Sequence, residues 1–179
     1  MANLKYIVKN PDKYIGNPHA VFGRSRWELY YMNVLDNSSL VIRWMSEPKY
    51  LNIRYLDPTA GIDIKTGKRV PKKNGTSVYW PDFIVQYSDG SVDIVEIKPL
   101  KEARPSAANT MYDKLTLVKN MAKWQAADRF AKSIGARFKV LTEEQLFGGT
   151  SGTKRQTTKP TIGTRKPNKA KRTTRGTRK

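Results

Sequence analysis

Residues 80–99 read WPDFIVQYSDGSVDIVEIKP, and this stretch decides the fold. β-Branched and aromatic residues run on both sides of the dipeptide Asp89-Gly90, which is typical of the turn of a β-hairpin. We therefore expect two strands, at 78–87 and 92–98. Pro99 ends the second strand, because proline lacks the N–H that a strand ladder needs.

Three charged side chains in this hairpin are candidates for chemistry. Glu96 and Lys98 are two residues apart on one strand, so their side chains share a face, and Asp82 lies on the paired strand. Two converging carboxylates repel each other unless a divalent cation lies between them. Mg²⁺, or Mn²⁺ in its place, takes oxygen ligands and lowers the pKa of a bound water, which can then attack a phosphodiester. Lys98 could orient or deprotonate this water, or offset charge that develops on the phosphate.

A third carboxylate, Glu28, lies one turn into the first predicted helix. The candidate catalytic residues are therefore Glu28, Asp82, Glu96 and Lys98, and the candidate metal ligands are Asp82, Glu96 and Glu28. Other interpretations stay open. Glu28 could only cap its helix, Asp82 could simply begin a strand, and Glu96 with Lys98 could be an exposed charge pattern. Charges that interrupt an apolar strand are costly, however, which favours a role in chemistry.

The register of the hairpin decides whether these side chains can meet. A two-residue Asp89-Gly90 turn would place Asp82 opposite Ile97, and opposite residues point to the same face. Asp82 would then face away from Glu96 and Lys98. We therefore predict a bulge, a one-residue change of register, or an Asp82 that lies just before regular pairing begins.

The rest of the chain alternates helical and extended patterns. Ser25 and Glu28 form a capping box at the start of a helix that runs to about Leu35. A long helix is predicted at 109–134, with an apolar stripe of Met111, Leu115, Val118, Ala122 and Ala126. Further strands are predicted at 40–44, 50–56 and 137–141, a charged loop at 57–77, and a short final helix at 142–146. This order predicts an α/β fold with a mixed sheet.

Composition excludes several classes of site and favours an anionic partner. The chain has no cysteine, which excludes disulfides, zinc-thiolate sites and thiol catalysis. It has one histidine, which argues against sites that need several histidines. No apolar run resembles a membrane helix or a signal peptide, so we expect no membrane partner. The net charge is +19, and residues 148–179 contain 11 of the 34 Lys/Arg and no acid. Such a surplus is typical of proteins that bind nucleic acid.

The charge divides the chain into an expected domain at 1–147 and a basic Thr/Lys/Arg-rich tail at 148–179, which we expect to be disordered. Lysines and arginines in the 57–77 loop, on the long helix and in the tail could contact DNA phosphates, although charged loops and helix faces are also simply solvated. These candidate DNA-binding residues are Lys65, Lys68, Arg69, Lys72, Lys73, Lys119, Lys123, Lys154, Arg155, Arg165, Lys166, Arg172 and Arg175.

The hairpin motif resembles that of the PD-(D/E)xK nuclease superfamily, which uses a Pro-Asp, then Glu-x-Lys, with an acidic residue on the first helix. Those positions are Pro81-Asp82, Glu96-Ile97-Lys98 and Glu28 here. The resemblance implies an αβββαβ core with a mixed sheet and a Mg²⁺-dependent (or Mn²⁺-dependent) DNA endonuclease.

Over about residues 10–147 the chain looks like the head completion nucleases of T4-type tailed phages. The matching segments begin at Tyr14, Arg24, Trp44, Pro81, Glu96, Lys123 and Phe138. This resemblance implies a virion protein, made in the host cytoplasm, that acts on packaged double-stranded DNA ends at the portal vertex before tail attachment, with portal or neck proteins as partners. Two alternatives remain: a head-closure or neck protein that binds DNA without needing cleavage, and a junction-resolving or transposase-associated nuclease.

Removing the tail tests its expected role. If all its charges touched phosphate, the slope of log K against log salt concentration for DNA binding could approach about −10 as an upper bound. Deletion of residues 148–179 should therefore weaken DNA binding and flatten this slope, as measured by fluorescence anisotropy over a salt series. An unchanged slope would mean that the tail serves a protein partner instead.

Overall fold

The computed structural model describes residues 3–71 and 75–148. Its centre is a four-stranded mixed sheet with the strand order β3-β6-β7-β8. The strands β3 and β7 are each antiparallel to β6, and β8 is parallel to β7. Their bounds are Val41–Ser46 for β3, Phe83–Tyr87 for β6, Val92–Ile97 for β7 and Arg137–Leu141 for β8.

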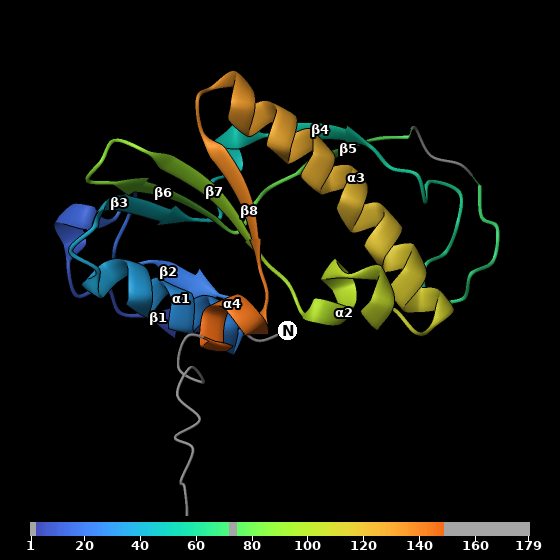
Figure 1. Cartoon of the computed structure of the whole chain (residues 1–179), viewed down its shortest axis with the longest axis horizontal. Helices are drawn as coiled ribbons and strands as arrows, with labels where there is room; N and C mark the ends of the chain where they lie inside the picture. The colour runs from blue at the N-terminus through green and yellow to red at the C-terminus, as the bar shows by residue number, and fades with distance from the viewer. Residues whose placement is uncertain (1–2, 72–74, 149–179) are drawn as a thin grey trace, which may run out of the picture.

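Helices cover both faces of this sheet (Figure 1). The helix α1 (Arg26–Asn37) lies on one face, and the long helix α3 (Met111–Ser133) lies on the other. The chain order α1, β3, β6, β7, α3, β8 confirms the predicted αβββαβ core. The short helix α4 (Glu143–Phe147), predicted at 142–146, follows β8 and begins at a capping box of Thr142 and Gln145.

Two apolar clusters mark the two faces. On the α1 side, Val95 and Ile97 of β7 pack in one cluster with Met32 and Leu35 of α1. On the α3 side, Ile94 packs with alanines of α3 in a second cluster. Since side chains alternate along a strand, Glu96 shares the α3 side of β7 with Ile94.

The predicted strand 78–87 is wrong as one element, because it forms two strands in different sheets. Its first part is β5 (Thr76–Tyr79), which pairs with β4 (Ile53–Leu56) in a separate two-stranded sheet. Its second part is β6. The chain passes between the two sheets at residues 80–82, where Pro81 has no N–H to donate to a ladder. The loop before β5 accordingly ends at Gly75, two residues earlier than predicted.

Other elements differ from the sequence-based expectation in smaller ways. The predicted strand 50–56 begins only at Ile53, because Lys49–Leu51 forms a 3₁₀ turn after Pro48. The predicted stripe on α3 is confirmed only in part: Ala126 is buried and Ala122 packs against the core, but Met111 and Val118 are exposed. The buried positions of α3 are Asp113, Leu117, Asn120, Ala126, Ala127 and Ala131.

Five short elements were not predicted. They are β1 (Leu4–Tyr6), its antiparallel partner β2 (Val21–Gly23), α2 (Leu100–Ala103) and the 3₁₀ turns Pro11–Lys13 and Pro105–Ala107. Three- and four-residue elements leave little periodic signal in a sequence. Within the described ranges, none of the helices combines the length and apolar character needed to cross a bilayer.

The β6–β7 hairpin has the register that the candidate site requires. Phe83 pairs with Val95 and Ile84 with Ile94, one residue away from the pairing of a two-residue turn. Tyr87 N–H donates to the Ser91 carbonyl at 2.9 Å, so these two residues close the hairpin around a loop of three residues, 88–90. Within the loop, Gly90 N–H donates to the Tyr87 carbonyl at 3.0 Å. Gly90, at φ +82°, supplies the left-handed residue of such a loop. The predicted change of register is confirmed.

Gly90→Ala tests the contribution of this loop. The added Cβ would meet no atom within 4 Å, so the cost comes from the left-handed backbone alone. We expect the free energy of unfolding to fall by about 1 kcal/mol, measured by urea denaturation. Gly75→Ala is the matched control, since its Cβ also meets nothing within 4 Å but its φ is not in the left-handed region. It should change stability by no more than about 0.5 kcal/mol, and equal losses would contradict the argument.

Candidate active site

Asp82 lies immediately before β6 and is held against β7 by its own side chain. Oδ2 of Asp82 accepts a hydrogen bond from Ile97 N–H at 2.8 Å, and the Asp82 carbonyl accepts one from Glu47 N–H at 2.8 Å. Phe83 pairs with Val95, so extending the β6–β7 pairing by one residue places Asp82 opposite Glu96. The two carboxylates therefore lie on the same side of the hairpin.

The Glu96 carboxylate is almost fully buried, with 3% of the residue exposed, and both its oxygens are engaged. Oε2 accepts a hydrogen bond from the Tyr79 hydroxyl at 2.6 Å. Oε1 forms an ion pair with Nζ of Lys98 at 3.0 Å. A charge-assisted bond on each oxygen fixes the carboxylate in one orientation.

The electrostatics of the site favour an additional cation. Burial raises the pKa of Asp82 well above its usual range, and the charges of Glu96 and Glu28 raise it further. Lys98 and the Ile97 N–H oppose this rise in the Asp82 pKa without cancelling it. Its neighbours therefore only partly compensate the ionised form of Asp82.

Lys98 and Tyr79 both keep their protons. Burial lowers the pKa of Lys98, but the neighbouring carboxylates Glu96 and Asp82 outweigh that effect and raise the pKa above its usual value. Burial and Glu96 likewise raise the pKa of the Tyr79 phenol. Lys98 is thus a permanent cation at neutral pH, which suits charge stabilisation better than removal of a proton from water.

A cavity of about 510 Å³ opens beside these groups. It lies between the start of α1 and the end of β7, and its walls include Arg24, Trp27, Glu28, Asp82, Lys98 and Glu102. Glu28 reaches this cavity but is committed to its helix cap. Its carboxylate accepts hydrogen bonds from Arg24 N–H and from the Ser25 hydroxyl, each at 2.9 Å.

The residues present fit a divalent cation held by two carboxylates. Within residues 3–71 and 75–148, no three His, Cys, Asp or Glu side chains are clustered as a metal site, so Glu28 does not complete a trio with Asp82 and Glu96. Mg²⁺ is commonly bound through one or two carboxylates and several waters. Oδ1 of Asp82 forms no hydrogen bond with any described residue and remains available as a ligand.

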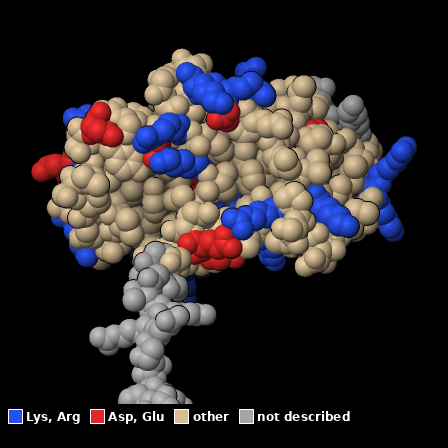
Figure 2. Space-filling view, in the orientation of Figure 1, with Lys and Arg blue, Asp and Glu red and all other residues tan. Residues whose placement is uncertain are grey.

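The predicted DNA contacts occupy different environments. Lys65, Lys68 and Arg69 are exposed on the loop before β5. This loop lies at the right-hand side of Figure 1, and Figure 2 shows basic side chains at that end of the molecule. Lys119 forms an ion pair with Asp57 at 2.8 Å, which ties the beginning of that loop to α3. Lys123 is partly buried, with Nζ 5.8 Å from the centroid of the Tyr79 ring. The remaining candidates, Lys72, Lys73, Lys154, Arg155, Arg165, Lys166, Arg172 and Arg175, lie outside the described residues.

Sequence reasoning missed Tyr79 as a partner of Glu96. Tyr79 falls in the predicted strand 78–87. In the structure it lies on β5, which pairs with β4, and its hydroxyl reaches Glu96. The ion pair of Glu47 with Arg24, at 2.5 Å, was also missed.

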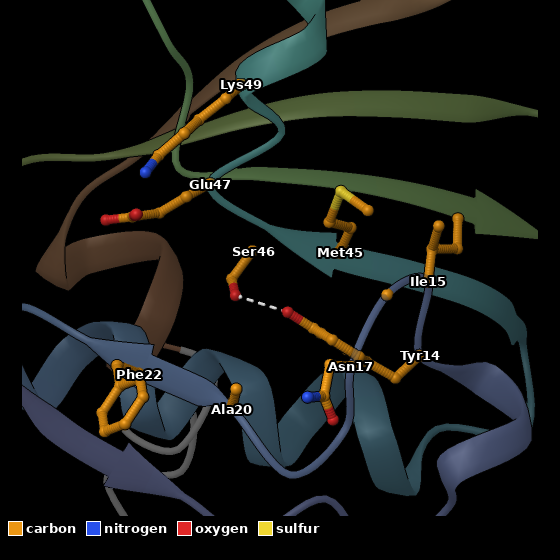
Figure 3. A pocket seen from close by; sticks show the side chains of 10 residues that line it. Tyr14, Ile15, Asn17, Ala20, Phe22, Met45, Ser46, Glu47 and Lys49 are labelled. Atoms are coloured by element: carbon orange, nitrogen blue, oxygen red, sulfur yellow. Dashed lines mark hydrogen bonds between the residues drawn. The ribbon is translucent and has the colours of Figure 1, made fainter.

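Glu47 borders a second cavity of about 300 Å³, where the Tyr14 and Ser46 hydroxyls lie 3.0 Å apart (Figure 3). Trp80, beside the catalytic candidates in sequence, is half exposed.

Comparison with known proteins agrees with this geometry. Residues 38–143 match the family described as TnsA-like endonuclease N terminal, and the match includes Asp82, Glu96 and Lys98 but not Glu28. The chain is also 32% identical over 152 residues to the head completion nuclease of Enterobacteria phage T4, covering 79% of this chain and 91% of that protein. The chain therefore belongs to the TnsA-like endonuclease N-terminal family of PD-(D/E)xK nucleases and is a homologue of the phage T4 head completion nuclease.

Proposed function

We propose that this protein is a divalent-metal-dependent DNA endonuclease with Asp82, Glu96 and Lys98 at its active site. The observation that carries the proposal is the convergence of Asp82 with the buried Glu96–Lys98 ion pair beside an open cavity. The incompletely compensated carboxylate of Asp82 supports a metal requirement, and membership of an endonuclease family supports the reaction.

Asp82 and Glu96 would hold the metal, Mg²⁺ or Mn²⁺. When bound, it would supply Lewis-acid polarisation of the phosphodiester and lower the pKa of a water. The protein's own groups have separate tasks. Ile97 N–H and Tyr79 orient the two carboxylates, and the Lys98 ammonium stabilises negative charge that develops on the phosphate. Glu28 contributes its charge from the cavity wall while it caps α1.

The exposed cations Lys65, Lys68 and Arg69 would bind the DNA backbone beside the site, and the basic tail would add further phosphate contacts. These contacts read no sequence, because phosphates are the same at every step of the duplex. A net charge of +19 supports double-stranded DNA as the substrate.

The biological setting follows the head completion relative. Since the alignment covers 91% of that protein, we propose that this chain also acts in phage head completion. It would act on packaged DNA ends at the portal vertex before tail attachment, with portal or neck proteins as partners. It would be found in the host cytoplasm during assembly and in the virion afterwards.

Replacing the proposed catalytic residues tests the reaction. Asp82→Ala removes a proposed metal ligand and Lys98→Ala removes the stabilising cation. Each should reduce the cleavage rate of linear and nicked DNA by about 10²–10³-fold or more, measured with Mg²⁺ or Mn²⁺ under single-turnover conditions. Lys101→Ala, an exposed lysine three residues after Lys98, is the matched control and should cleave normally.

Equal cleavage by the wild type and by both variants would remove the active-site proposal. The role in the phage is tested with the same Asp82→Ala change. If cleavage is needed for head completion, the mutant phage should give few infectious, tail-joined particles. Normal yields would instead favour a head-closure protein that binds DNA without needing cleavage.

The pKa of Asp82 predicts a specific pH dependence of stability. Because the folded-state pKa is raised above the unfolded value of 3.8, the group contributes stability that is present below that value and lost as pH rises through the raised pKa. In EDTA, the wild type should therefore become less stable than Asp82→Asn as the pH rises from about 4 to about 8. Urea denaturation at each pH measures the difference in free energy of unfolding.

A bound metal ion should reverse the order of stability and make the wild type more stable than Asp82→Asn. At a metal concentration of about 100 times Kd, the wild type should gain about 2.7 kcal/mol of stability at neutral pH, and Asp82→Asn should gain much less. Asn keeps the acceptor for Ile97 N–H, so the comparison isolates the charge. Equal stabilisation of both proteins by Mg²⁺ or Mn²⁺ would show that Asp82 is not a ligand.

A further inference from the structure

Lys123 is a half-buried cation without an ion-pair partner among the described residues. Two other lysines in the same neighbourhood are paired: Lys98 with Glu96 at 3.0 Å, and Lys119 with Asp57 at 2.8 Å. Lys123 makes neither a salt bridge nor a side-chain hydrogen bond to any residue in the ranges 3–71 and 75–148. Its ammonium group lies over the face of the Tyr79 ring, 5.8 Å from the ring centroid.

The position of Lys123 connects it to the active site. It lies in the middle of α3, beside Ala122, Ala126 and Ala127 of the cluster that packs against Ile94 of β7. Glu96 is on that same side of β7. The Tyr79 ring under the Lys123 ammonium carries the hydroxyl that donates to Glu96 at 2.6 Å, so a single side chain separates Lys123 from the catalytic carboxylate.

The charge of Lys123 is poorly compensated in the protein alone. Burial lowers the pKa of Lys123, the charge of Glu96 opposes this effect, and the nearby cations Lys98 and Lys119 lower the pKa further. A contact with an aromatic face compensates only part of the cost of burying an ammonium group. A lysine kept under these conditions, next to a site that acts on an anion, is suited to bind that anion.

We propose that Lys123 binds a backbone phosphate of the DNA adjacent to the phosphodiester that is cleaved. This inference rests on the proposed nuclease function and assigns α3 a direct part in holding the substrate. The phosphate would supply the negative charge that Lys123 lacks and reduce its repulsion with Lys98 and Lys119. Lys119 has a different task, because its charge is already used to hold the loop at Asp57.

Lys123→Met tests the inference, because methionine is an unbranched side chain that lacks the positive charge. The control is Lys132→Met, which removes an equal charge from the far end of the same helix, where Lys132 is exposed and paired with Asp128. Binding of a short DNA duplex is measured by anisotropy over a salt series, with both changes made in the cleavage-silent Asp82→Asn protein. Lys123→Met should weaken binding severalfold and reduce the salt slope by about 1, whereas Lys132→Met should change neither.

Two further readouts keep the result decisive. Chemical acetylation of lysines, followed by mass spectrometry, should show Lys123 protected by DNA and Lys132 not protected. In single-turnover cleavage, Lys123→Met in the otherwise wild-type protein should raise the DNA concentration for half-maximal rate more than it lowers the maximal rate. Thermal unfolding should show that Lys123→Met folds as well as the wild type, and if it does not, the protection of the wild-type lysine decides the question.

Unchanged affinity and slope in Lys123→Met, losses equal to those of Lys132→Met, or acetylation of Lys123 that DNA does not reduce would each overturn the inference. Failure of the nuclease proposal would give a different result in the cleavage measurement. In that case neither the wild type nor the control would cleave DNA, while the binding and protection measurements would still report on Lys123.

Discussion

The hydrogen bond from Ile97 N–H to the Asp82 carboxylate depends on one constraint, the register of the β6–β7 hairpin. A three-residue loop with Gly90 in the left-handed region sets this register. In a β-sheet, a slip of one residue turns every side chain to the other face. A shorter turn would therefore leave Phe83 and Asp82 on exchanged faces, with an aromatic ring in the site and a carboxylate in the core. The core and the site are thus specified by the same few residues.

Burial then gives the site its chemical character. Glu96 would be costly in an apolar cluster, but Tyr79 and Lys98 each occupy one of its oxygens. Among the described residues Asp82 has no side-chain partner of that kind, and burial raises its pKa. A protein with a large positive net charge therefore contains a small region in which an ionised carboxylate is only partly compensated. Basic residues around an acidic centre suit the binding of a polyanion together with a metal ion.

The two helices that cover the central sheet, α1 and α3, contribute different groups to the site. The first helix, α1, brings Glu28 to the cavity wall but uses the carboxylate to cap its own N-terminus. The long helix, α3, packs on the side of β7 that carries Glu96, and Lys119 and Lys123 project from it. Lys119 holds the loop before β5, while Lys123 lies next to Tyr79 and has no ion-pair partner in the part of the chain that the structure describes. Helix α3 thereby joins the scaffold, the basic loop and the candidate site.

The sequence by itself determined the αβββαβ order, the N-cap at Ser25 and the candidate residues Asp82, Glu96 and Lys98, because caps, turns and strand alternation are local signals. It also indicated that the hairpin had to depart from a two-residue turn. Only the tertiary structure decided that residues 76–87 belong to two sheets, that Tyr79 supports Glu96, and that Lys119 and Lys123 differ in their partners. The buried face of α3 was also beyond the sequence, since alanines and polar residues form most of it and give no clear apolar stripe. Each of these features depends on contacts between residues far apart in the chain, and a pattern of neighbouring residues carries no information about such contacts.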